Sequence, residues 1–180
     1  MNKSVYDTPD NISVSRRHIL TVLVDNEPGV LARVIGMFSG RGYNIESLNV
    51  AEVSNDNHLS RITIVTEGTS EVVMQIEKQL LRIVPVHSVT NLDEEGSSVE
   101  AEVALVSIDL NDSNKKKIYE VCDFYRARKI ENENNSVIFE IAGASERINR
   151  FINEINLITK IEIVRSGPVA ISTHKNTEEE

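Results

Sequence analysis

The sequence predicts an α+β protein of two ferredoxin-like βαββαβ domains in tandem. Strand-like and helix-like segments follow one another in the same order twice, and a polar, acidic stretch over residues 93–98 separates the two cycles. Four strands and two helices in this order close into an antiparallel sheet with both helices on one face. Because 180 residues divide into two small cores, we expect oligomerisation to stabilise the chain.

The first cycle lies in residues 17–93. Apolar side chains recur at helical spacing from Val30 until Gly40 and Gly42 end the first helix. Pro85 cannot donate a backbone hydrogen bond, so the strand that carries it is expected at a sheet edge. The other patterns predict strands at residues 18–24, 45–53, 59–66 and 84–92 and a second helix at residues 72–83.

The second cycle lies in residues 99–167, where Ser145 is the expected cap of the second helix. The two chain ends are polar, and we expect a flexible extension at residues 1–16 and a frayed tail at residues 168–180. The patterns predict strands at residues 99–110, 130–133, 137–142 and 158–165, a helix at residues 116–128, and a helix after Ser145 that buries Ile148, Phe151, Ile152 and Ile155.

Composition excludes several classes of protein. The formal charge of −9 and the pI near 5.0 oppose nucleic-acid binding, and the basic run at residues 115–117 is interpreted as the solvated first turn of a helix. The single cysteine, Cys122, lies on an apolar helical stripe and is expected in the core. The chain has neither a targeting signal nor an apolar run of membrane-spanning length, which predicts a cytoplasmic protein.

The sequence carries no recognisable catalytic constellation. The four histidines have no ligand-like spacing to one another or to Cys122, so no metal site is expected and the histidines are interpreted as surface residues. There is no phosphate-binding loop, and Gly40-Arg41-Gly42 lacks the third glycine of a dinucleotide fingerprint. We therefore expect no catalytic residue in this chain.

The most informative segment runs from Asn26 to Ile45. Asn26 and Gly29 lie where a strand gives way to a helix, and free backbone N–H groups at such a turn attract an anion, in particular a carboxylate. Asn44 follows the helix and adds an amide that can donate to a carboxylate and accept from an ammonium group. Together these groups suit a free amino acid.

Ordinary turn chemistry offers another interpretation of the same residues. Asn26 can cap the helix, Pro28 can fill its first turn, and Gly29 can relieve crowding. Gly42 can likewise end the helix, and Asn44 can be a turn residue that tolerates a positive φ. The residues alone leave both interpretations open.

Two further strings point to a family. Residues 41–48 read RGYNIESL and residues 59–61 read LSR, at a fixed distance from the Asn26-x-x-Gly29 turn. In this arrangement they resemble the N-terminal ACT domain of the small, regulatory subunits of acetohydroxyacid synthase, also called acetolactate synthase. The resemblance covers residues 17–92; the second half keeps the family's length and order of elements and lacks its usual closing Arg-Gly.

The resemblance implies a feedback site between two paired ACT domains. In the family, the turn of one domain and the strand start of the other enclose the effector, usually valine and sometimes leucine or isoleucine. Carried over to this sequence, the implied effector-binding residues are Asn26, Gly29, Val30, Leu31, Asn44 and Ile45.

The resemblance also implies a partner. A small subunit of this kind has no activity of its own, forms a homodimer through its ACT domains, activates the large catalytic subunit and confers feedback inhibition on branched-chain amino-acid synthesis. Thiamine diphosphate, magnesium and FAD belong to that large subunit, and no cofactor is expected in this chain. The alternative is a stand-alone tandem ACT sensor that acts on another enzyme or on a transcription factor.

Overall fold

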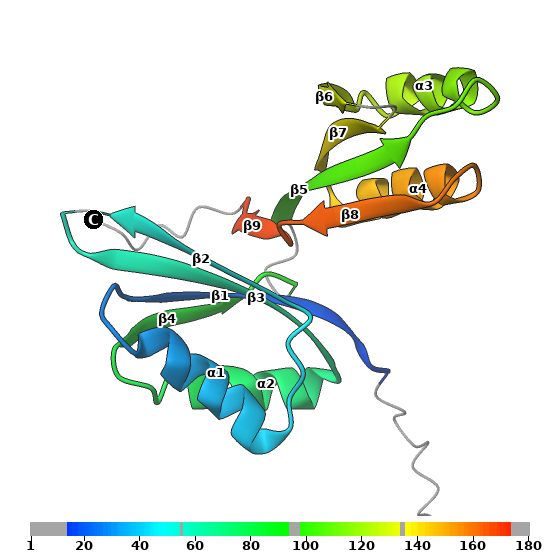
Figure 1. Ribbon diagram of the computed structural model, residues 1–180. Coiled ribbons are helices and arrows are strands. Elements are labelled where there is room, and N and C mark those ends of the chain that lie inside the picture. The colour runs from blue at the N-terminus through cyan, green and yellow to red at the C-terminus, as the bar shows by residue number, and fades with distance from the viewer. Residues whose placement is uncertain (1–13, 55, 94–97, 134–135, 174–180) are drawn as a thin grey trace, which may run out of the picture.

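The computed structural model describes residues 14–54, 56–93, 98–133 and 136–173, and it contains two βαββαβ units (Figure 1). The predicted fold class is confirmed. Among the described helices the longest have 12 residues, and none of them is long and apolar enough to cross a membrane. The first unit consists of β1 (Arg16–Asp25), α1 (Val30–Arg41), β2 (Ser47–Ser54), β3 (Leu59–Gly68), α2 (Ser70–Leu80) and β4 (Val86–Asn91).

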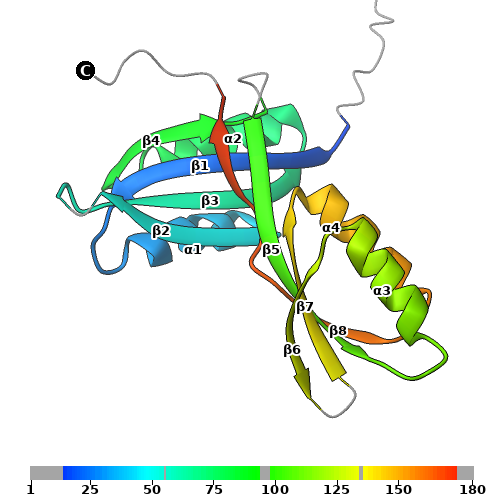
Figure 2. The same cartoon turned by 90° about the horizontal axis from the view of Figure 1, so that it is seen from above.

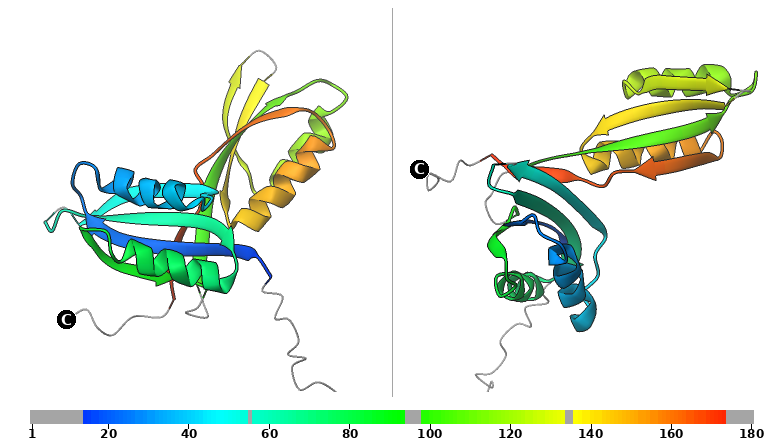
Figure 3. Two further views of the ribbon diagram at one scale, coloured as in Figure 1. Left: turned by 90° about the horizontal axis from the view of Figure 1, so that it is seen from below. Right: turned by 60° about the vertical axis from the view of Figure 1, so that its left-hand side comes forward.

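The first sheet has the antiparallel order β2-β3-β1-β4, with α1 and α2 on one face (Figure 3). Alternate residues of β1, namely Leu20, Val22 and Val24, point to the helices and are fully buried. Strand β4 is an edge strand, as predicted, but it begins at Val86 and does not contain Pro85. The face opposite the helices is left for other elements to cover.

The second unit consists of β5 (Ser98–Asp109), α3 (Lys115–Phe124), β6 (Arg128–Glu133), β7 (Ser136–Gly143), α4 (Ser145–Asn156) and β8 (Ile161–Arg165), in the sheet order β6-β7-β5-β8. Cys122 lies in its core, as predicted, where burial and the nearby Asp123 carboxylate raise the pKa of the thiol to about 12. The prediction that α3 runs to Arg128 was wrong, because Arg126 takes a positive φ that turns the chain into β6.

The expected tail contains a further strand. The prediction of a frayed segment at residues 168–180 was wrong for β9 (Val169–Ser172), which pairs with residues 98–101 of β5. Strands β8 and β9 follow each other along the same edge of β5 and are separated only by residues 166–168. Residues 174–180 and most of the predicted extension, residues 1–13, lie outside the described residues.

The ribbon of β5 and β9 crosses the open face of the first sheet (Figure 2). Ala170 of β9 is buried there against Ile19, Val65 and Leu92, a small apolar cluster separate from the two cores. This burial explains why a short segment with a polar continuation is ordered as a strand. The second domain is therefore joined to the first both by the chain between β4 and β5 and by the returning β9.

One histidine contradicts the expectation of surface positions. His18 of β1 is only 1% exposed because it points to the helix-covered face, and its Nδ1 lies 3.0 Å from Oδ2 of Asp93. Its neighbour in sequence, Ile19, points to the opposite face and contributes to the cluster around Ala170. Alternate side chains of β1 thus pack into the first core on one face of the sheet and into the domain junction on the other.

Candidate functional site

The predicted anion-binding turn lies between β1 and α1. Gly29 has φ 88° and occupies the position before α1, and no side chain caps the helix there. In the part of the chain that the structure describes, the backbone N–H groups of Gly29 and Leu31 have no hydrogen-bond partner. Donors left free at a helix N-terminus are the groups that bind a carboxylate.

The capping interpretation of Asn26 is wrong. Its backbone N–H donates to the carbonyl of His58 at 2.6 Å, which fixes the start of the turn against the β2–β3 connection. Its side chain is exposed and has no partner among the described residues. The amide of Asn26 is therefore available to a ligand.

One ion pair and one histidine–carboxylate contact hold this turn in place. The Arg33 guanidinium binds Glu27 at 2.8 Å and also donates to the carbonyl of Val84, and His87 Nε2 lies 2.6 Å from Asp25 Oδ1. Because the Glu27 carboxylate is paired with a guanidinium, its repulsion of an incoming anion is reduced. Sequence reasoning missed Arg33 and His87, since no local spacing links either of them to the turn.

The second predicted group, Asn44 and Ile45, follows the C-terminus of α1. Gly42 ends this helix with φ 71°, as predicted. The backbone carbonyl of Asn44 accepts from Thr66 Oγ1 at 2.6 Å, while its side-chain amide is exposed and has no partner among the described residues. Ile45 packs partly buried against the first core. Asn44 does not have a positive φ, so this part of its turn interpretation was wrong.

The structure brings the predicted residues together in two separate groups. Asn26, Gly29, Val30 and Leu31 lie at the N-terminal end of α1, and Asn44 lies beyond its C-terminal end. A helix rises 1.5 Å per residue, so the 12 residues of α1 separate the two groups by about 20 Å. One chain therefore cannot close both groups around one amino acid.

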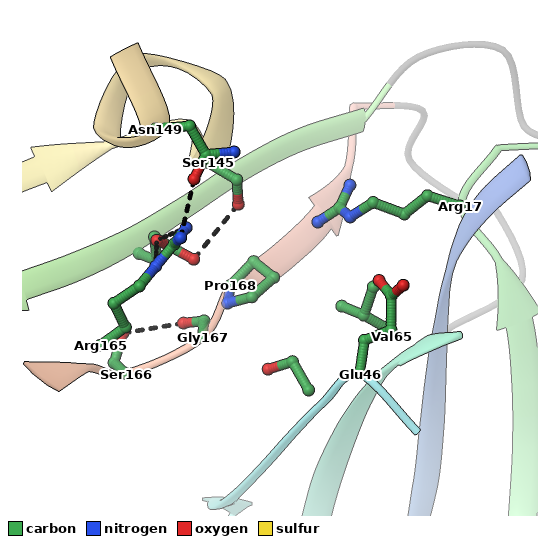
Figure 4. A pocket seen from close by; sticks show the side chains of 11 residues that line it. Arg17, Glu46, Val65, Ser145, Asn149, Arg165, Ser166, Gly167 and Pro168 are labelled. Carbon is green, nitrogen blue, oxygen red and sulfur yellow. Dashed lines mark hydrogen bonds and ion pairs between the residues drawn. The ribbon is translucent and has the colours of Figure 1, made fainter. Parts of the chain in front are cut away.

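A cavity of ≈450 Å³ lies elsewhere, at the domain junction (Figure 4). The first domain contributes residues of β1, β3 and the start of β2, and the second contributes β5, β8, α4 and the turn before β9. Its lining residues are Arg17, Glu46, Ser47, Val65, Glu102, Ser145, Asn149, Arg165, Ser166, Gly167 and Pro168. No local sequence pattern predicts this cavity, because its walls come from both domains.

Ion pairs and close backbone contacts fix the walls of this cavity. Arg17 binds Glu100 at 2.7 Å across the junction, and Asn49 Nδ2 donates to the carbonyl of Pro168 at 2.9 Å. Gly167 has φ 72°, and a Cβ there would meet the Oγ of Ser47 at 2.0 Å. The turn before β9 can therefore approach β2 only with glycine at this position.

The N-terminus of α4 lies in the same wall. The prediction of Ser145 as the helix cap was wrong, since Ala144 holds that position. The backbone N–H of Ser145 donates to Glu100 at 3.2 Å and its hydroxyl to Glu102 at 3.2 Å. Carboxylates from β5 thus satisfy donors that sequence analysis assigned to local capping.

Comparisons with known proteins agree with the order of the domains. Residues 20–88 match the AHAS small subunit-like ACT domain, and residues 101–174 match the family model described as the small subunit of acetolactate synthase. The chain belongs to the acetolactate synthase small-subunit family. The resemblance inferred from residues 17–92 is confirmed, and the match extends through β9 of the second domain.

Alignments with individual relatives cover most of this chain and nearly all of each relative. A probable acetolactate synthase small subunit of Archaeoglobus fulgidus is 39% identical over 155 residues, which cover 86% of this chain and 96% of the relative. The isozyme 3 small subunit of Escherichia coli is 42% identical, with coverage of 87% and 95%. The crystal structure of the small subunit from Thermotoga maritima superposes with a TM-score of 0.78 at 35% identity, over 89% of this chain and 99% of that one.

Proposed function

We propose that this chain is the regulatory, non-catalytic subunit of acetolactate synthase, which activates the large catalytic subunit and makes it sensitive to valine. The observation that carries the proposal is the open turn at Gly29, with its free backbone donors and unpaired Asn26 amide. This turn lies within the residues that match the AHAS small subunit-like ACT domain. Leucine or isoleucine can replace valine as the effector. The thiamine diphosphate, magnesium and FAD of the reaction belong to the large subunit, and the complex is cytoplasmic.

The turn supports a specific way of holding the effector. The free N–H groups of Gly29 and Leu31 bind the carboxylate beside the N–H of Val30, which donates to the Glu27 carbonyl at 3.4 Å, and the helix dipole adds a favourable field. Asn26 and Asn44 orient the polar head. Val30 is buried and shapes the floor, while Leu31 and Ile45 are partly buried at the two ends of α1 and line the slot for a branched side chain. A methylene changes affinity by only about 1 kcal/mol, so discrimination among branched amino acids is modest.

The separation of the two groups supports a homodimer. Because about 20 Å of helix lies between them, we propose that the turn of one protomer meets Asn44 and Ile45 of its partner. Effector binding then favours one packing of the dimer over another, since affinity differs between the two arrangements. The large subunit senses this change in packing.

Reconstitution tests the regulatory assignment. The purified chain is assayed for acetolactate formation from pyruvate alone, and then with the large subunit over a range of valine concentrations. We expect no turnover by the chain alone, higher turnover by the mixture, and inhibition by valine only in the mixture. Turnover by the chain alone overturns the proposal, and a chain that binds valine without affecting the large subunit favours a stand-alone sensor.

A mixing experiment tests the composite site. Asn26→Ala and Asn44→Ala chains are coexpressed, purified as a mixture and compared with each variant alone in the reconstituted enzyme. A dimer with one chain of each kind keeps one intact site, made of the wild-type turn of one chain and the wild-type Asn44 of the other. We expect partial recovery of valine inhibition; equal insensitivity of the mixture and the single variants contradicts a site shared between protomers.

A further inference from the structure

The junction cavity has the charge pattern of a ligand site. Its volume of ≈450 Å³ lies within the range of small-molecule sites, about 300 to 1,000 Å³. Two arginines and two glutamates line it, so its formal charge is balanced. A balanced lining favours neither a simple anion nor a simple cation.

Two of these four charged residues, Arg165 and Glu102, already pair with each other within the second domain. Arg165 donates through Nε to Glu102 at 2.7 Å, and through Nη1 to Asn149 at 2.7 Å. Glu102 is 4% exposed and also accepts from the Ser145 hydroxyl. With Glu100 bound to the backbone of Ser145, the N-terminus of α4 already has its anions. A phosphate or other external anion therefore finds no vacancy on this wall.

The other two charged residues, Arg17 and Glu46, still have hydrogen-bonding groups available to a ligand. Arg17 uses one Nη2 contact for Glu100 and keeps further N–H groups of its guanidinium. The Glu46 carboxylate has no side-chain partner within the described residues, and no ion pair joins it to Arg17 although both border the cavity (Figure 4). Two opposite charges that face one cavity without touching are complementary to a ligand that carries both an anionic and a cationic group.

We propose that the junction cavity binds a small zwitterion of the α-amino-acid class, with its carboxylate on Arg17 and its ammonium group on Glu46. Val65 and Pro168 provide the apolar part of the lining, which suits a short aliphatic side chain. Asn149 and Ser47 add neutral polar groups from the two domains. This site is distinct from the turn at Gly29, which lies at the other end of β1, although Glu46 follows directly after Asn44 and Ile45.

A ligand in this cavity touches both domains at once. Arg17 and Glu46 belong to the first domain, whereas Pro168 and Asn149 belong to the second. Binding therefore stabilises the junction, including the contact of Gly167 with Ser47, relative to a separated arrangement. The consequence is a second control over the position of the second domain.

The test uses the full chain with the proposed effector turn, which is remote from the cavity, disabled by Asn26→Ala and Gly29→Asp. Glycine, L-alanine, L-serine and L-valine are titrated calorimetrically into this background. We expect saturable binding of at least one of them with one site per chain. L-valinamide, which lacks the carboxylate, and isovalerate, which lacks the ammonium group, are expected to bind at least tenfold more weakly than L-valine.

Variants on the cavity walls locate the site. Glu46→Gln and Arg17→Gln each remove one charge-assisted contact and are expected to weaken binding roughly tenfold to a hundredfold. Asn149→Phe fills the cavity from exposed α4 and is expected to abolish binding. The controls are Asn153→Phe, one turn further along α4, and Glu52→Gln, which removes an exposed carboxylate from β2 outside the cavity; neither is expected to change binding.

Several outcomes overturn the proposal. Absence of saturable binding in the background chain does so, as does binding that survives Glu46→Gln and Asn149→Phe. Equal binding of isovalerate and L-valine shows an anion site instead of a zwitterion site. Because Arg17 also binds Glu100, the Arg17→Gln variant can fail to fold. In that case Glu46→Gln and Asn149→Phe, which replace exposed side chains, decide the test. Valine inhibition of the enzyme is decided separately by the turn at Gly29.

Discussion

The two domains have the same order of elements but differ at the turn between their first strand and first helix. In the second domain the Asn111 side-chain oxygen accepts from the backbone N–H groups of Ser113 and Asn114, each at 3.0 Å. Asn114 in return accepts from the backbone of Asn111 at 2.8 Å and donates to the carbonyl of Asp109 at 3.1 Å. This turn satisfies its own donors.

The turn of the first domain does the opposite. It also contains an asparagine, but the Asn26 side chain does not fold back, and Gly29 takes a left-handed conformation that leaves N–H groups open. The difference is therefore in where the hydrogen bonds go, and not in whether asparagine is present. The same place in one fold is a closed structural turn in one domain and a candidate ligand site in the other.

Gly29→Asp breaks the open turn most severely. Aspartate at φ 88° is strained and places a negative charge beside the bound carboxylate. We expect valine inhibition of the reconstituted enzyme to weaken by more than about a hundredfold, while activation of the large subunit persists. Asn26→Ala and Asn44→Ala each lose one amide and shift the inhibition curve roughly tenfold to a hundredfold. Unchanged valine sensitivity leaves the turn without a binding role.

Gly167→Ala tests the junction that joins the two domains. A Cβ at this position lies 2.0 Å from Ser47 Oγ, on a backbone with φ 72°. We expect the free energy of unfolding in urea to fall by about 1 to 3 kcal/mol. The matched control is Gly40→Ala, an exposed helical position with no atom within 4 Å, where we expect little change or a gain of about 0.5 to 1 kcal/mol. Equal effects of the two substitutions contradict a tight junction.

Asn111→Ala breaks the closed turn of the second domain. The variant loses the side-chain acceptor that serves two backbone donors, and we expect a destabilisation of about 1 to 2 kcal/mol in urea unfolding. Valine inhibition should keep its midpoint, because this turn has no role in effector binding. A shifted midpoint with unchanged stability contradicts the contrast between the two turns.

The smallest expected effect concerns the reactivity of Cys122, which tests whether the core of the second domain excludes solvent. Burial holds its pKa at about 12, so the folded thiol stays protonated and is expected not to react with a disulfide reagent at pH 8. In urea the same thiol should react completely. Its contribution to stability is present below the unfolded pKa of 9.0 and declines as pH rises toward about 12. Rapid labelling of the folded chain contradicts this core assignment.

Sequence patterns predicted both cycles because each element carries a local signal. The helical spacing from Val30 and the glycines at its end were sufficient for α1, and the strand–turn–helix transition identified Gly29. Features that depend on distant surfaces were not predictable. Val169–Ser172 has few residues and becomes a strand only because β5 pairs with it and Ala170 meets Ile19. The cavity likewise exists only once both domains are in place.

Strand β9 is synthesised late, yet it covers part of the first domain. The residues of the first sheet leave the ribosome well before Val169–Ser172, which complete the cover over Ile19, Val65 and Leu92. A nascent chain that has not yet released β9 can form the complete first sheet with this apolar surface still open. The first domain is consequently finished last, during an interval in which chaperones or a neighbouring nascent copy can reach it.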